Sequence, residues 1–142
     1  MTFHTETQNT VRTRWNSLVE VNLRIPTIYP NTLSVPPSPG SIDYWAQYDM
    51  VETDAAQGDI GADNPLYRHV GFVNINLYFK LGGTAKSPNE LLDSIIPLFR
   101  SVTVTTPSGF VIVFRTPRVT RIGEYREWYA INLTLPFYAD EV

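Results

Sequence analysis

The sequence contains no cysteine, and this absence removes disulfides, thiolate metal sites and a cysteine nucleophile together. Histidine is also scarce, because the two that occur, His4 and His69, are too few for a histidine-rich metal site. No apolar run approaches the roughly 18 residues that a membrane-spanning helix needs. The first residues lack the basic and then apolar pattern of a signal peptide, so we expect no membrane contact and synthesis in a cytoplasm.

Charged side chains are also few, at 18% of the 142 residues, whereas about a quarter is usual. The net charge of −3 is too small, and of the wrong sign, for a protein that holds nucleic acid over its whole surface. Aromatic residues reach 13%, which favours a surface partly covered by another chain. A chain of this length is expected to form one domain over residues 1–142, burying roughly 68–70% of its unfolded surface.

No familiar catalytic or phosphate-binding motif is found, neither Gly-x-Ser-x-Gly nor Gly-x-x-x-x-Gly-Lys-Ser/Thr. We therefore expect a protein that is not an enzyme, with no catalytic residue, no cofactor and no metal site. His69 follows Arg68 in a predicted strand, a setting that favours a structural or interfacial role over that of a general base.

Three aspartates, Asp54, Asp59 and Asp63, fall within residues 53–65, whose composition predicts a loop. Their carboxylates could bind a cation, but the spacing differs from that of a calcium-binding loop and no glutamate closes it. A solvated acidic loop is the better interpretation. A loop of this length inside a compact domain is usually functional or mobile.

Hydrophobic periodicity predicts the secondary structure. The clearest pattern runs from Tyr67 to Leu81, where apolar and polar side chains alternate with period two, so this segment is the predicted central strand. A 3.6-residue apolar period predicts helices over residues 5–20 and 87–99. Further strands are predicted over residues 42–52, 102–105, 110–115, 118–122 and 127–137, with a proline-containing edge segment over 25–31. This order predicts an α+β fold, a single twisted, mainly antiparallel sheet with two helices packed on it.

Four arginines near the C-terminus, with aromatic side chains among them, come closest to a nucleic-acid patch. The residues are Arg115, Arg118, Arg121, Arg126, Tyr125 and Trp128. Such a pattern can hold a single strand by charge and stacking. The alternative is that the arginines pair with Glu124, Glu127 or acids of a neighbouring molecule. The negative overall charge favours this alternative.

Residues spread over positions 25–138 occur in an order and spacing that resemble a known family. They are Tyr29-Pro30-Asn31, Pro36-Pro37, Asn64, Arg68, Gly71, Phe79, Gly82, Phe99, Ile122-Gly123, Trp128-Tyr129, Asn132 and Phe137. The series resembles the tail-terminator, or tail-completion, proteins of long-tailed bacteriophages. The sequence departs from the family pattern in a loop before Asn64 that is poor in positive charge, and in Pro97 within the second helix.

The resemblance implies a structural virion protein at the head-proximal end of the tail, assembled in the host cytoplasm. It implies a ring of identical subunits, typically a hexamer, that caps the tail tube, stops its polymerisation and presents a surface to head-completion proteins. DNA would pass through such a ring only as cargo, which favours a neutral or negative lumen. The alternatives that stay open are another head–tail connector component and a small ligand- or cation-binding module. The candidate subunit-interface or lumen residues are Asp54, Asp59, Asp63, Arg68, Arg118 and Arg121.

Overall fold

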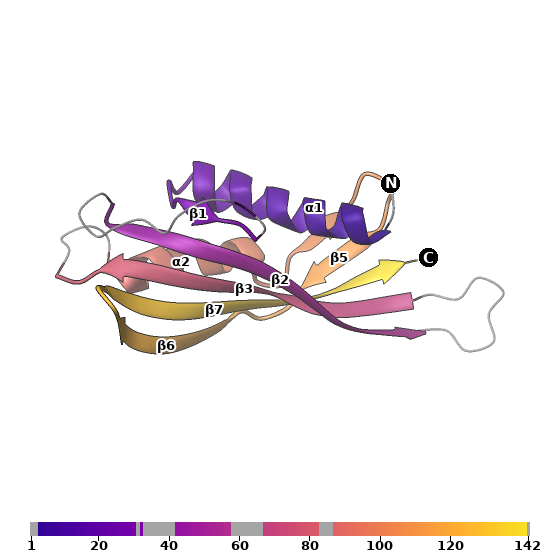
Figure 1. Ribbon diagram of the computed structural model, residues 1–142. Helices are drawn as coiled ribbons and strands as arrows, with labels where there is room; N and C mark the ends of the chain where they lie inside the picture. The colour runs from indigo at the N-terminus through magenta and orange to yellow at the C-terminus, as the bar shows by residue number, and fades with distance from the viewer. Residues whose placement is uncertain (1–2, 31, 33–41, 58–66, 83–86, 142) are drawn as a thin grey trace.

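The computed structural model describes residues 3–30, 32, 42–57, 67–82 and 87–141, with the backbone alone for residues 53–57. It is built on a twisted sheet of seven strands (Figure 1). The strands are β1 (Thr27–Ile28), β2 (Tyr44–Gln57), β3 (Tyr67–Lys80), β4 (Thr103–Thr105), β5 (Val111–Phe114), β6 (Arg118–Tyr125) and β7 (Trp128–Glu141). Their order is β1-β2-β3-β7-β5-β4, and β6 pairs with β7 off this path. Every described pair is antiparallel except β1–β2, so the predicted α+β class and sheet type are confirmed.

β3 is the central strand, as its alternation predicts. It pairs along its length with β2 on one side and β7 on the other, and each of the three strands has 14 residues. Its buried residues on the helical face are Val73, Ile75, Leu77 and Phe79. The alternation assigns Leu81 to this face as well, which is wrong, because β3 ends at Lys80 and Leu81 is 41% exposed. The chain turns there at Gly82, whose φ of +68° suits a residue without a side chain.

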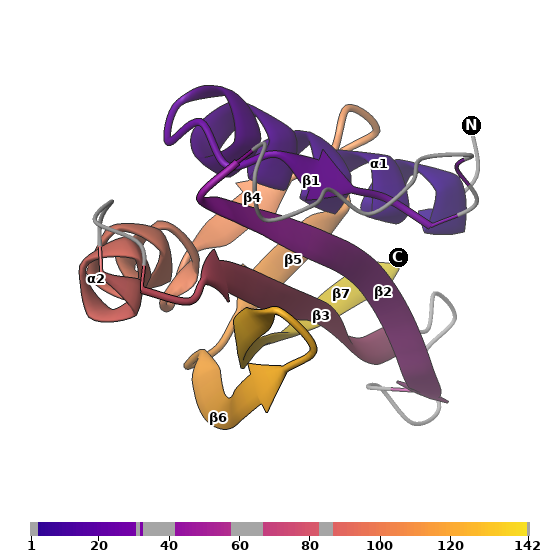
Figure 2. The same ribbon diagram turned by 60° about the vertical axis from the view of Figure 1, so that its left-hand side comes forward.

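Both helices pack on the same face of the sheet (Figure 2). Helix α1 (Phe3–Trp15) continues into a π-helical turn, η1 (Asn16–Val21), and α2 (Pro88–Phe99) follows β3. The helical side chains in the common core are Phe3, Val11, Trp15, Val19, Leu91, Leu92, Ile95 and Phe99. None of the described helices is long and apolar enough to cross a membrane.

Specific hydrogen bonds begin and end α2. The Ser87 hydroxyl accepts from the Glu90 N–H at 3.2 Å, and Pro88 occupies the first helical position, where its missing N–H costs nothing. At the other end, Arg14 of α1 donates from Nε and Nη2 to the Leu98 carbonyl, at 3.2 and 2.6 Å. A carbonyl in the last turn of a helix has no partner within the helix, so Arg14 both caps α2 and joins the two helices.

Two predicted boundaries differ from the structure. The first helix begins at Phe3 instead of residue 5, and its regular α-helical part ends at Trp15. β2 does not end at residue 52 but continues through a bulge between Glu52 and Asp54 to Gln57. Residues 53–57 are predicted as loop but form strand. Their intrinsic preference for β-strand is weak, and pairing with residues 67–70 outweighs it. The remainder of the predicted loop lies outside the described residues.

Candidate assembly surfaces

The sheet has an open backbone edge along β2. β1 pairs only with Ala46 and Gln47, so the rest of this edge has no partner strand in the described structure. The Ala46 N–H bonds the Pro26 carbonyl across this edge at 2.8 Å, so the alternate residues that follow present their backbone groups there. One of these groups, the Met50 N–H, donates to the Asp49 carboxylate at 2.9 Å. An open edge of this kind can pair with a strand of another chain.

The face of the sheet opposite the helices, which we call the outer face, carries a network of side-chain amides. Asn132 Nδ2 donates to the Oδ1 atoms of Asn74 and Asn76, at 2.7 and 2.9 Å. Its own Oδ1 accepts from the Thr134 hydroxyl at 3.0 Å. These bonds connect β3 and β7, so the polar middle of the outer face is held rigid without a covering helix in the described structure.

One end of the outer face is aromatic. Trp45, Tyr78 and Trp128 form a second apolar cluster, with the Trp45 and Tyr78 rings stacked at 4.4 Å. Burial raises the pKa of Tyr78, because the phenolate would be poorly solvated there. The sequence pattern places aromatic residues on both faces of the sheet, and this cluster shows that the outer ones stabilise the sheet itself.

Only one of the three predicted acidic residues, Asp54, belongs to the part of the chain that the structure describes. Asp54 belongs to β2 and stands opposite Val70 of β3, directly after the bulge. Asp59 and Asp63 lie outside the described residues. The predicted acidic group is therefore not a loop throughout, because its first member is fixed in the sheet.

Arg68 is held on the outer face by a carboxylate and an aromatic ring. Its Nε and Nη2 donate to the two oxygens of Asp140, at 2.8 and 3.0 Å, and its guanidinium lies 4.0 Å from the Tyr138 ring centre. The hydrogen bond with Asp140 raises the pKa of Arg68. Arg115 also approaches Tyr138, at 5.1 Å. Arg68 thus has partners within its own chain and remains partly exposed.

Arg118 and Arg121 lie on opposite faces of β6. Arg118 stands in register with Thr134 on the outer face, and Arg121 stands in register with Ile131 on the helical face. Arg121 donates to the Asn89 side chain at the start of α2, at 2.6 Å. A single nucleic-acid patch does not form from these arginines, because period-two alternation sends them in opposite directions. In the described structure neither residue forms an ion pair with Glu124 or Glu127.

Apolar side chains are exposed on both faces of β6. Val119, in register with Leu133, is exposed on the helical face, and Tyr125, in register with Trp128, is exposed on the outer face. β6 pairs only with β7 in the described structure. Ile122 falls at a bulge between Arg121 and Gly123 and is 53% exposed. Arg126 lies 5.4 Å from the Tyr125 ring centre. Exposed apolar side chains on an open strand are typical of a surface that meets another protein.

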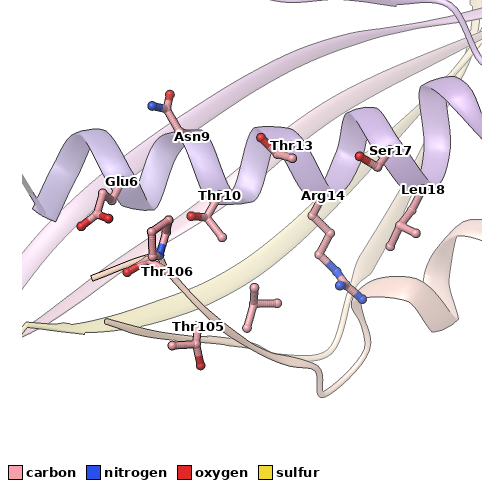
Figure 3. Close-up of a pocket in the computed structure, with 11 residues that line it drawn as sticks. Glu6, Asn9, Thr10, Thr13, Arg14, Ser17, Leu18, Thr105 and Thr106 are labelled. Carbon is pink, nitrogen blue, oxygen red and sulfur yellow. The ribbon is translucent and has the colours of Figure 1, made fainter. Parts of the chain in front are cut away.

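A groove of about 640 Å³ runs between α1 and the β4–β5 turn (Figure 3). Glu6 and Arg14 project from α1 into the lining of this groove, Glu6 near Thr106 and Arg14 toward the end of α2. Glu6 is buried, and its Oε1 accepts from the Ser108 N–H at 3.0 Å. Arg14 is occupied by the Leu98 carbonyl, and burial lowers its pKa. Both charged side chains of the groove therefore hold elements of the fold together.

The structure brings both histidines together, which the sequence pattern does not predict. His4 Nδ1 lies 2.8 Å from Glu52 Oε2, and His69 Nε2 lies 3.1 Å from Glu141 Oε1. The two imidazole rings are 5.2 Å apart and nearly perpendicular. The alternation of β3 does place His69 on the helical face. No sequence signal indicates which helical turn lies above it, so His4 could not be assigned.

The comparisons with known proteins decide the family. The family model described as "Phage tail terminator protein" matches residues 10–137. The chain belongs to the phage tail terminator family. The suspected resemblance is thereby confirmed, and with it a structural role in phage tail assembly as a virion component that contacts other tail or head proteins.

A search of the curated proteins found no match to this tail terminator. Among solved structures, one chain superposes with a TM-score of 0.66 at 15% sequence identity, over 95% of this chain and 96% of its own length. At this identity the superposition establishes a shared fold. Another chain of similar length thus shares the overall fold.

Proposed function

We propose that this tail terminator forms a ring, a hexamer, that caps the head-proximal end of the tail tube and stops its polymerisation. The upper surface of the ring would receive the head-completion or connector protein, and DNA would pass through the lumen only as cargo. The observation that carries the proposal is the family match over residues 10–137, and the open edges of the sheet support it.

A ring of identical subunits requires two different surfaces that fit each other on neighbouring copies. The open part of β2 offers one, because its outward backbone groups have no partner strand in the described residues. β6 offers another, with Val119, Ile122 and Tyr125 exposed beside it. The two strands lie on opposite sides of the β3–β7 pair, so a head-to-tail arrangement can be continued around a ring.

We also propose that Asp54, Asp59 and Asp63 face the lumen or a neighbouring subunit. An acidic lumen would repel the DNA backbone and so let it slide without binding. Replacing all three by alanine should reduce ring formation or phage titre. Unchanged ring formation and unchanged titre in the triple variant would contradict this assignment.

The oligomeric mass, measured by light scattering with and without purified tail-tube protein, tests the ring. We expect a mass of several subunits, and tubes of uncontrolled length in lysates that lack the protein. Ile122→Asp should block assembly, because it places a charge at the most exposed apolar side chain of β6. Val21→Asp, at an even more exposed position of η1 (66%), is the matched control and should assemble normally.

Electron microscopy distinguishes the proposal from its nearest alternative, a connector component that acts after the tail is complete. Labelled protein should mark the head-proximal end of isolated, headless tails. Tails of normal length in its absence, with the protein bound only to heads, would favour the connector instead.

A further inference from the structure

We propose that His4, Glu52 and His69 form a binding site for a transition-metal ion, Zn²⁺ in particular. The three residues come from separate elements: the first turn of α1, the bulge of β2 and the start of β3. One ligand atom from each lies within 4.8 Å of the others. Two imidazoles and one carboxylate are a donor set that suits zinc, whereas Mg²⁺ and Ca²⁺ prefer oxygen ligands.

The distances allow coordination after small side-chain movements. Ligand atoms about 2.0–2.2 Å from a tetrahedral zinc ion lie about 3.4 Å apart. The present separations of 4.8 Å or less therefore require the ligand atoms to approach by at most about 1.4 Å, which side-chain rotation can supply. The 2.8 Å contact between His4 Nδ1 and Glu52 Oε2 would open slightly as both atoms turn to the metal.

One carboxylate oxygen of Glu52 has no partner among the described residues. Glu52 Oε2 contacts His4, but Oε1 is buried with no hydrogen bond to this part of the chain. A buried and unpartnered carboxylate oxygen is unfavourable, because water no longer solvates it. If His4–Glu52 and His69–Glu141 were only two separate ion pairs, nothing would compensate for the lost solvation of this oxygen. A metal ion bound by the Glu52 carboxylate would compensate for its lost solvation.

The backbone around Glu52 is shaped to bring it toward the histidines. The β2 bulge follows Glu52, and bulges often re-aim a side chain next to a binding site. Gly71 stands opposite Glu52, and a Cβ there would lie 3.2 Å from the Glu52 Cα. The absence of a side chain at residue 71 thus permits the close approach of the two strands at the site.

The surroundings fix His69 and leave His4 accessible. The Phe3 ring lies 4.5 Å from the His69 ring, and Glu141 contacts the His69 Nε2. A carboxylate beside a ligand histidine commonly orients its ring and strengthens metal binding. The His69 side chain is only 12% exposed, whereas that of His4 is 60% exposed. His4 therefore provides an entry path, with room for a water molecule as a further ligand.

Isothermal titration of the full chain, without a polyhistidine tag and after treatment with EDTA, tests the site with ZnSO₄ alone. We expect saturable binding of one Zn²⁺ per chain and a higher thermal midpoint, with no response to MgSO₄ at the same concentration. Co²⁺ should give a visible absorption band that Zn²⁺ removes. These measurements use the isolated chain, so their outcome is independent of ring formation.

Two variants and one control locate the binding. His4→Ala and Glu52→Gln should each weaken Zn²⁺ binding by more than about tenfold. Gln8→Ala, another exposed position of α1, should bind as the unaltered chain does. Far-ultraviolet circular dichroism confirms that each variant is folded. The absence of saturable Zn²⁺ binding, or equal binding by the His4→Ala variant, would overturn the proposal.

Discussion

Gly71 is the position where the structure predicts the sharpest response to a single added methyl group. A Cβ at residue 71 would lie 2.6 Å from the Val51 carbonyl oxygen, 3.0 Å from Phe137 Cζ and 3.2 Å from the Glu52 Cα. The nearest of these atoms belongs to the backbone of the paired strand and cannot rotate away. The Phe137 ring is buried in the core and has little space to move.

The free-energy cost of Gly71→Ala follows from these contacts. The added carbon must move about 0.5 Å or more from the Val51 oxygen, which requires β2 and β3 to separate at the bulge. Overpacking of this kind costs about 1–3 kcal/mol, and contact with backbone favours the upper end. Alanine also restricts the unfolded chain, which returns about 0.4–1 kcal/mol. We expect a net loss of about 2 kcal/mol in the free energy of unfolding.

Urea denaturation, followed by tryptophan fluorescence and circular dichroism, measures this loss. A decrease of about 2 kcal/mol lowers the thermal midpoint by about 4–8 °C in a chain of this size. Gly82→Ala is the matched control, because a Cβ there meets nothing within 4 Å and only the φ of +68° opposes it. That substitution should cost about 1 kcal/mol. A Gly71→Ala variant within about 0.5 kcal/mol of the unaltered chain would refute the steric reasoning.

Three further predictions use the same denaturation assay. Leu77→Ala should lower the free energy of unfolding by about 2–5 kcal/mol, because Leu77 is buried at the centre of β3 and its removal leaves a cavity. Arg14→Ala should cost about 1–3 kcal/mol through the lost bonds to the Leu98 carbonyl, and Arg14→Lys should recover part of this. Burial and the hydrogen bond with Glu20 raise the pKa of Tyr29 to about 12 from 10. The folded state therefore holds the Tyr29 proton more tightly than the unfolded state, and this difference adds to the free energy of unfolding. The contribution is complete below pH 10 and is lost as the pH rises toward 12. Tyr29→Phe should remove this part of the pH dependence of the free energy of unfolding.

The fold was largely predictable from the sequence because its central strand is regular. Five apolar side chains alternate with polar ones between residues 73 and 81, and four of them are in the core. The order of helices and strands then leaves few arrangements other than one layer of helices on one sheet. The strand ends were less predictable. β2 continues past residue 52 because its partner β3 extends there, and pairing between distant segments is invisible to local patterns.

The candidate surfaces were predictable only in part. The family series includes Arg68 and Gly71, and the structure gives each a physical role, in the Asp140 ion pair and at the β2 bulge. Arg118 and Arg121 are three residues apart and so fall on opposite faces of a strand, which the sequence could have indicated. The contact between His4 and His69 depends on where a helix lies across the sheet, and that position follows from packing of the whole core.

The start of β3 separates two surfaces within four residues. Arg68 and Val70 lie on the outer face, where Arg68 contacts Asp140. His69 and Gly71 lie on the helical face, close to His4 and Glu52. Ile122 lies opposite residues 130–131 of β7, which pair with residues 77–78 of β3, far along the strand from His69. Because distant substitutions act independently, loss of assembly in the Ile122→Asp variant should occur independently of loss of Zn²⁺ binding in the His4→Ala variant. Each variant then reports on one proposal alone, and the double variant should show both defects without further loss of either kind.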